Sequence, residues 1–379
     1  MKKKFFLLCI LVVLLFSITG CYDANSIETY YYIVAIGIDK GVDYKYNISI
    51  QIAKNEDSSS SASGSSQSSS YAIYQVECET FENGINIFNN YLNKTIDLSH
   101  CSAIIFSEEI AREGLGNIIN SLAANDEIRP TAYILISNKT AFDVLDKVSN
   151  SGEKFSSRFY EYIISSANNT GYSGKTTFDE FVSKTNSNIE DCVTIYSYVN
   201  NDTVQNVGLA IFKNDKMVGT VNSLDSISHL LLSNDLLEAI ITIPNPFIND
   251  SYIDLEIKNY KNSKIDVSII NNTPFITCDL FINANIKTSG KNFDYTKNEN
   301  IKTVEFYAKN FLQNMISEYL YKISKIYNAD VLEFQRNFSK KCFTNSELEN
   351  YKFREVFKDS YFNVNVNFKI KSTHLYIKE

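Results

Sequence analysis

The first twenty residues form a segment that is not expected to belong to the folded part of the chain. Three lysines, Lys2 to Lys4, precede twelve consecutive apolar residues, Phe5 to Phe16. A helix of that length covers roughly 18 Å, which is too short for the hydrocarbon core of a bilayer. A positive start followed by a short apolar run is typical of a signal peptide. We therefore expect residues 1–20 to be removed and the remainder to fold outside the cytoplasm.

The residues at the end of this segment predict how the chain is held afterwards. Ile18, Thr19 and Gly20 lead directly to Cys21. An apolar residue, two small residues and a cysteine resemble the bacterial lipobox, whose cysteine is acylated after cleavage. Two or three acyl chains anchor a protein stably, whereas one chain is marginal. We predict lipid attachment at Cys21 and a location on the outer face of the membrane; the alternative is an ordinary secretory signal with an incidental cysteine.

The other cysteines do not indicate a disulfide framework or a metal site. Removal of residues 1–20 and acylation of Cys21 leave an odd number of thiols, widely spaced and without a Cys-x-x-Cys pair. His100 adjoins one of them, but the chain has only 3 histidines. We predict no metal site. We expect buried thiols at the five remaining positions, Cys78, Cys101, Cys192, Cys278 and Cys342.

Charge and motifs exclude several further classes of protein. The formal net charge is −8, and no basic block follows Lys4, so we predict no nucleic-acid partner. The chain has neither a phosphate-binding loop nor a Gly-x-Gly-x-x-Gly fingerprint. Gly171–Gly174 is one residue short of a nucleophile elbow. Glu108 and Glu109 begin a predicted helix, where acidic side chains favour the helix dipole. We therefore predict no cofactor and no catalytic residue. The lack of such motifs favours a binding or scaffolding protein over an enzyme.

The pattern of residues 21–199 predicts an N-terminal α/β domain. Residues 30–39 and 44–53 alternate around a short polar turn, which predicts a β-hairpin. Ser58–Ser70 is almost entirely serine and is expected to be a flexible loop. After it, strand and helix patterns alternate. Strands are predicted at 71–79, 103–106, 132–136 and 193–199, and helices from Phe81, through Ile118 and Leu122, at 140–148 and at 178–184.

Residues 207–379 predict a C-terminal domain of a different kind. A hairpin is expected across Asn214–Asp215, followed by a short helix at 223–232. Three alternating runs, near 253–257, 265–269 and 275–287, predict an antiparallel sheet with one wet face. Apolar residues at helical spacing over 301–327 predict a long helix packed on that sheet, or, as the alternative, docked on a partner helix. Alternation over 362–370 predicts a last strand. The whole chain is therefore expected to be mixed α/β, or α+β.

Four parts of the chain form a pattern when they are taken together. They are Cys21–Asp23 with Ile36–Gly41, Ile104–Leu115 with Asp126–Arg129, Gly208–Gly219, and the long helix running into Asp330 and Phe334 with the strand that follows. In this order they resemble the C-subunit lipoproteins of spore germinant receptors, the Ger(x)C family. The resemblance covers nearly all of the chain after residue 20. Tyr22 replaces the family's usual tryptophan, Asn125 stands where an arginine is common, and the serine run is not part of the pattern.

This resemblance implies a fold of about three subdomains and no enzymatic activity. It also implies membrane-embedded A and B subunits as partners, in the inner membrane of the spore. Gly208, Phe212, Asp215 and Gly219 are interpreted as a tight structural hairpin, with contact to a partner as the alternative. The competing hypothesis for the whole protein is a solute-binding lipoprotein of a membrane importer. Such a protein has two α/β lobes around a cleft, and the predicted antiparallel second half argues against it.

Overall fold

The computed structural model describes most of the chain after residue 28. The predicted signal peptide lies almost wholly outside the described residues, and the predicted attachment site Cys21 and the predicted loop Ser58–Ser70 lie fully outside them. No helix within the described part of the chain is long and apolar enough to cross a membrane. The described residues are 3–5, 29–53, 71–149, 160–162, 164, 169–187, 189–201, 203–288, 297–342, 344, 348 and 350–373.

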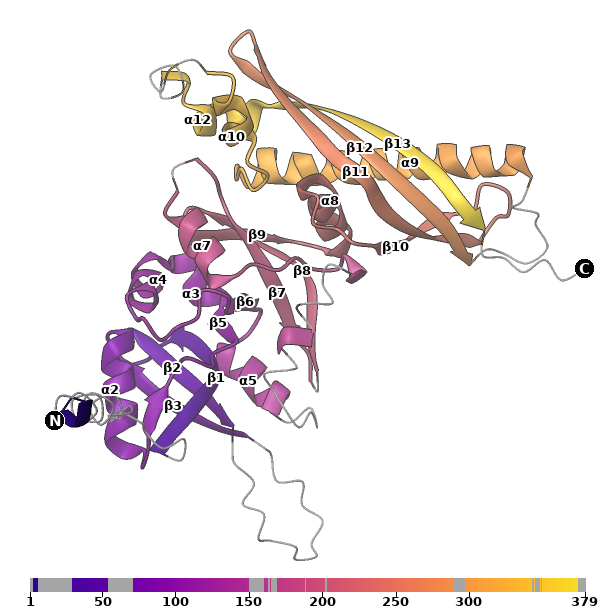
Figure 1. Cartoon of the computed structure of the whole chain (residues 1–379). Helices are drawn as coiled ribbons and strands as arrows, with labels where there is room; N and C mark the ends of the chain where they lie inside the picture. Colours follow the sequence, from indigo (N-terminus) through magenta and orange to yellow (C-terminus); the bar gives the residue numbers. More distant parts are fainter. Residues whose placement is uncertain are drawn as a thin grey trace, which may run out of the picture.

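A nine-stranded sheet forms the centre of what we call the body (Figure 1). Its four middle strands are parallel, and antiparallel pairs continue the sheet at both ends. The predicted hairpin of β1 and β2 is confirmed. The strands in spatial order are β3 (Tyr71–Cys78), β2 (Tyr46–Ala53), β1 (Tyr30–Lys40), β5 (Ala103–Ser107), β6 (Tyr133–Ser137), β7 (Val193–Val199), β8 (Val204–Lys213) and β9 (Lys216–Val221), with β4 (Thr95–Asp97) beside β1.

Helices cover both faces of the body sheet, as expected for a sheet whose central strands are parallel. One core contains Phe88, Ile118 and Phe181 from α2, α4 and α7, and the other contains Val144 and Leu145 from α5. The predicted alternation of strands and helices is therefore confirmed. The helices are α2 (Phe81–Tyr91), α3 (Glu108–Glu113), α4 (Gly116–Ala123), α5 (Ala141–Ser149) and α7 (Phe178–Thr185).

A four-stranded sheet and the long helix α9 (Asn298–Tyr321) form a second unit, which we call the arm. In Figure 1 the arm projects away from one end of the body. The predicted antiparallel sheet is confirmed, although it is formed by β10, β11 and β12, and β13 joins β12 in parallel because α9 lies between them in the chain. The strands in order are β10 (Ala239–Pro244), β11 (Tyr252–Ile270), β12 (Thr273–Thr288) and β13 (Tyr361–Thr373).

The expectation of separate strands at 253–257 and 265–269 is wrong. Both runs belong to β11, whose pairing with β12 shifts register between Asn259 and Lys264. The intervening segment is polar but has no glycine or proline to form a turn. Bulges therefore bend one long strand and do not divide it. β10 was not expected from the sequence.

The long helix packs on the arm sheet, as predicted. Val304, Leu312 and Tyr319 lie in the arm core, whereas Asn363, Asn365 and Asn367 lie on the exposed face of β13. The apolar spacing predicted that the helix would continue to residue 327 with its apolar residues buried, and this part of the prediction is wrong. A π-helical turn, η2 (Lys322–Ile326), follows α9 and leaves Ile326 exposed.

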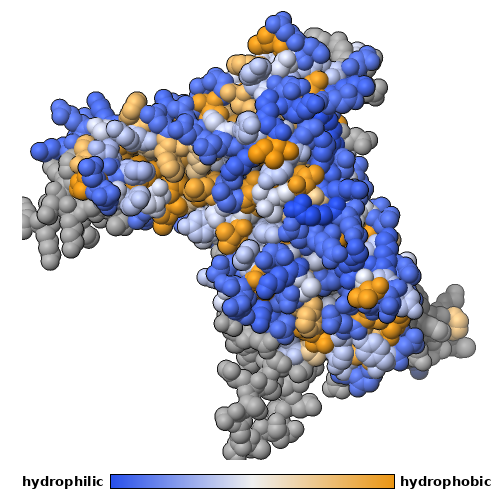
Figure 2. Space-filling model, turned by 180° about the vertical axis from the view of Figure 1, so that it is seen from behind, coloured by the Kyte–Doolittle hydropathy of each residue, from blue (hydrophilic) through white to orange (hydrophobic). Residues whose placement is uncertain are grey.

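Short elements complete the region where the arm meets the body. They are α8 (Ser223–Ser233), α10 (Phe334–Ser339), α12 (Phe353–Val356) and the 3-10 helix η3 (Phe357–Asp359). β8 pairs with β7, and β9 pairs with β8, so the body sheet includes residues on both sides of the boundary that we expect between 199 and 207. That boundary remains a prediction. Seen from behind, much of the visible surface is hydrophilic, and apolar side chains gather along the lower edge of the arm beside the body (Figure 2).

Candidate functional site at the junction of body and arm

The four residues that the sequence singled out lie on β8, β9 and the turn between them. Gly208 has φ +92°, and a Cβ there would lie 2.0 Å from the backbone oxygen of Val221, so only glycine fits. Phe212 is fully buried and packs edge to face against Phe181, with 5.0 Å between ring centroids. Both residues therefore stabilise the body itself.

Asp215 and Gly219 make contacts beyond the hairpin. Asp215 Oδ2 accepts a hydrogen bond from Gly116 N at 3.1 Å, which caps α4 from a distant part of the chain. A Cβ on Gly219 would lie 2.1 Å from Tyr327 Cε1, so this glycine makes room for a ring at the end of the arm helix. The Tyr327 hydroxyl also donates to Thr220 O at 2.7 Å. Gly219 therefore lies at the junction of body and arm.

Asp191, just before β7, forms the most buried polar contact between body and arm. Its side chain is 0% exposed and forms an ion pair with Arg354 of α12. Oδ1 also accepts a hydrogen bond from Asn214 N at 2.9 Å, and Oδ2 accepts one from Asp330 N at 2.8 Å. A buried carboxylate is retained only when such partners satisfy it. Asp191 therefore fixes the hairpin turn, the segment after the arm helix and α12 relative to one another.

The carboxylate of Asp330 lies beside this contact and is fully buried. It accepts hydrogen bonds from Phe334 N at 2.9 Å and Gln335 N at 2.7 Å, at the start of α10. Burial, and then the negative charge of Asp191, raise the pKa of Asp330 to about 7, although those two hydrogen bonds and Arg354 act in the opposite direction. The surroundings that raise this pKa come from both sides of the junction.

A second group of charges joins α7 of the body to α10 of the arm. Lys184 Nζ lies 2.9 Å from Glu180 Oε1 and 3.9 Å from Glu333 Oε1. Arg336 lies 3.0 Å from Glu333 Oε2 and 3.6 Å from Glu190 Oε1. Burial, and then the neighbouring charge of Glu333, raise the pKa of Glu190. The two cations offset the repulsion among three carboxylates that the junction brings together.

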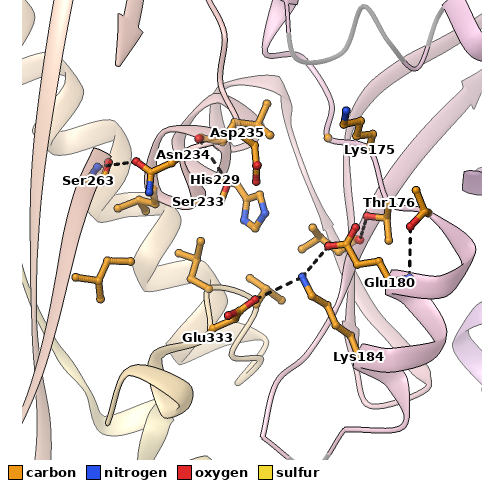
Figure 3. A pocket seen from close by; sticks show the side chains of 18 of the residues that line it. Lys175, Thr176, Glu180, Lys184, His229, Ser233, Asn234, Asp235, Ser263 and Glu333 are labelled. Carbon is orange, nitrogen blue, oxygen red and sulfur yellow. Dashed lines mark hydrogen bonds and ion pairs between the residues drawn. The ribbon is translucent and has the colours of Figure 1, made fainter. Parts of the chain in front are cut away.

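A cavity of about 520 Å³ opens beside these charges. Figure 3 shows side chains from α7, α8, β11 and the start of α10 pointing toward one another across it. Its apolar wall includes Leu230, Val331 and Leu332, and its polar residues include Lys175, Thr176, Glu180, Lys184, His229, Asp235, Ser263 and Glu333.

His229 is the buried polar residue that is fixed most firmly in this wall. It is 7% exposed, and its Nδ1 lies 2.7 Å from the hydroxyl of the fully buried Tyr319. Burial lowers the pKa of His229 to about 3, so the ring is neutral at physiological pH. Burial also raises the pKa of Tyr319 well above its usual value, so its hydroxyl keeps its proton. The pair is a neutral, positioned hydrogen-bonding unit.

Sequence reasoning did not identify this junction as a site. Asp191 and Arg354 are 163 positions apart, and His229 and Tyr319 are 90 apart, so no local spacing connects them. His229 alone could have indicated a site from the sequence. It precedes three leucines in a predicted helix, so it is a polar residue in an apolar stretch. Within the described residues, no group of three or more His, Cys, Asp or Glu side chains has the arrangement of a metal site.

The five cysteines in the described part of the chain form no disulfide, and one of them, Cys192, follows Asp191 directly and lies near Lys184. Cys78, Cys101, Cys192 and Cys278 are buried, as predicted, whereas Cys342 is half-buried. Burial raises the pKa of the Cys101, Cys192 and Cys278 thiols to about 12 in each case, so they are not reactive thiolates.

Comparison with known proteins identifies the family. A model of the spore germination protein N-terminal domain matches residues 23–197, and a model of the spore germination B3/GerAC-like C-terminal domain matches residues 207–374. The chain is 22% identical over 391 residues to the putative spore germination protein YfkR of Bacillus subtilis (strain 168), covering 95% of this chain and 94% of that one. It is 25% identical over 205 residues to the spore germination protein GerQC of Bacillus cereus, covering 53% of this chain and 56% of the relative.

A solved structure supports the same conclusion for the fold. The crystal structure of the GerBC protein aligns with a TM-score of 0.59 at 15% sequence identity and covers 88% of this chain and 96% of that chain. The mixed α/β fold expected from the sequence and the resemblance to the Ger(x)C family are both confirmed. Because the two family models together match most of its residues, this chain belongs to the GerAC-like family of spore germination proteins.

Proposed function

We propose that this protein is the lipid-anchored C subunit of a nutrient germinant receptor, that it contributes to receptor assembly, and that it has no catalytic role. The supporting observation is that both family models match, one to residues 23–197 and the other to residues 207–374. Buried contacts of Asp191 with Asp330 and Arg354 join the two matched parts. A body and an arm joined by buried contacts suit a subunit that positions other chains.

The proposed partners are the membrane-embedded A and B subunits, and the proposed anchor is an acylated Cys21. The sequence Ile18-Thr19-Gly20-Cys21 supports acylation. Seven residues lie between Cys21 and Thr29, where the described structure resumes, so eight steps from one Cα atom to the next join them. Such a segment reaches at most about 29 Å. An acylated Cys21 would therefore hold the start of β1 close to the outer face of the membrane.

Affinity capture from detergent-solubilised spore inner membrane tests this proposal. The wild type is compared with Cys21→Ala, which removes the attachment site, and with Cys342→Ala, which removes a distant thiol as a control. We expect the wild type and the control to recover multi-spanning receptor subunits, and Cys21→Ala to recover far less. Mass spectrometry of the mature N-terminal peptide checks the acylation directly.

Two results would contradict the proposal. Recovery of importer subunits would favour the competing hypothesis of a solute-binding lipoprotein. An unchanged germination response in spores that lack the gene, with related genes also deleted, would exclude a role in the receptor.

A further inference from the structure

The cavity at the junction has the size and position of a ligand site. Its volume of about 520 Å³ falls within the range of roughly 300–1,000 Å³ that small-molecule sites occupy. It lies between the body and the arm, and such boundaries between units are frequent places for binding sites. Its wall combines aliphatic side chains with a few convergent polar groups (Figure 3).

His229 presents a hydrogen-bond donor to this cavity. Tyr319 is fully buried, and His229 Nδ1 is the partner that its hydroxyl has among the described residues. The hydroxyl therefore donates to Nδ1, since a buried donor without a partner is costly, and the imidazole proton is on Nε2. Nε2 has no partner in the described structure, yet it is not among the buried unpaired polar atoms there. It is therefore accessible, and the cavity is the space that His229 lines.

Asp235 presents the complementary group. Its carboxylate points into the cavity (Figure 3) and forms no hydrogen bond or ion pair with the described residues. The neighbouring cation Lys184 is already shared between Glu180 and Glu333. Three carboxylates and the two lysines Lys175 and Lys184 line the cavity, so its lining carries a formal net charge of −1. An added cation is therefore favoured over an added anion.

We propose that this cavity binds a small organic molecule that carries both an ammonium group and a hydrogen-bond acceptor. The ammonium group pairs with Asp235, and the acceptor receives the Nε2 proton of His229. The aliphatic residues Leu230, Val331 and Leu332 exclude water from the carbon atoms between the two groups. This site does not depend on the proposed assembly role, because its ligand contacts residues inside the junction and not the outer surface.

Binding of three probes to the full-length protein in detergent tests the proposal. Ethanolamine carries both groups, propylamine lacks the acceptor, and glycolate lacks the ammonium. Calorimetry or saturation-transfer NMR gives the affinities. We expect ethanolamine to bind most tightly and Asp235→Asn to weaken it at least about tenfold, because a charge-assisted hydrogen bond is lost. Glu238→Gln, which removes an exposed carboxylate outside the cavity lining, is the matched control.

Each other outcome overturns the proposal. No saturable binding of ethanolamine at millimolar concentrations would mean that the cavity is not a site for this class. Tighter binding of glycolate would assign it to anions, and equal binding of propylamine would remove the role of His229. Equal losses in Asp235→Asn and Glu238→Gln would place the amine elsewhere on the surface. Because Asp235 is exposed, its replacement leaves the fold intact, and a circular dichroism spectrum checks this.

Discussion

Replacement of Arg354 by leucine tests whether the buried contact of Asp191 holds the arm to the body. The variant leaves the Asp191 carboxylate, 0% exposed, without its counter-charge. Removal of one partner from a buried ion pair typically costs about 3–5 kcal/mol. The Arg354 side chain is 19% exposed, so water partly solvates the pair. The two backbone hydrogen bonds to Asp191 also remain. We therefore expect the lower end, about 3 kcal/mol of unfolding free energy.

Urea denaturation followed by circular dichroism and tyrosine fluorescence measures this loss. Lys341→Met is the control, because Lys341 and Asp266 form an ion pair at 2.6 Å in which both side chains are largely exposed. Such pairs contribute about 0–1 kcal/mol. We also expect Arg354→Leu to separate the transitions of body and arm. A loss no larger than that of Lys341→Met, with a single transition, would refute the assignment of Asp191 as the main polar contact of the junction.

Three further predictions follow from the junction and the hairpin. Gly208→Ala should destabilise the body by more than about 3 kcal/mol by urea denaturation, because its Cβ would meet the backbone of Val221 and φ is +92°; Gly174→Ala, which meets only the end of the Leu209 side chain at 3.1 Å, should cost far less. Gly219→Ala should cost about 1–3 kcal/mol by displacing the Tyr327 ring, and Tyr327→Ser in the same chain should cancel part of that loss in a double-mutant cycle. The folded-state pKa of Asp330, about 7, lies above the unfolded value, so the stability that this residue contributes is greatest below pH ~4 and is lost as pH rises through 7. Over this pH range the melting temperature should fall less in Asp330→Asn than in the wild type. An equal dependence of melting temperature on pH in the two proteins would contradict the raised pKa of Asp330.

The sequence predicted elements whose periodicity is local. The β1–β2 hairpin, the helix predicted over 301–327 and the final strand each follow from residues within one run, although the α-helix itself ends at Tyr321. Predictions failed where a neighbour in space decides the outcome. β11 is one strand because β12 pairs along its whole length in spite of the polar segment, and β10 forms because Ala239–Pro244 can pair with β11. Both partners are close to β11 in sequence, but the pairing that continues β11 through its polar segment leaves no periodicity within that segment itself.

The candidate site could not be predicted in the same way, since its residues come from distant segments. Gly208 and Phe212 were found because a hairpin pattern contains them, and their roles are local to the body. Asp191 and His229 lie in short stretches that predict only a strand and a helix. Their significance depends on Arg354 and Tyr319, which the fold brings to them from the arm. Sequence reasoning therefore identified the parts of the molecule better than the contacts between them.

The junction links stability to any ligand in its cavity. Glu180 and Val193 belong to the body, whereas Ser263 and Glu333 belong to the arm, so a molecule bound among them contacts both units. A ligand at a hundred times its dissociation constant stabilises the state that binds it by about 2.7 kcal/mol. This is close to the expected cost of losing the Arg354 contact. A ligand of the proposed class and the buried contact of Asp191 would therefore each stabilise the junction of body and arm, with effects of similar size.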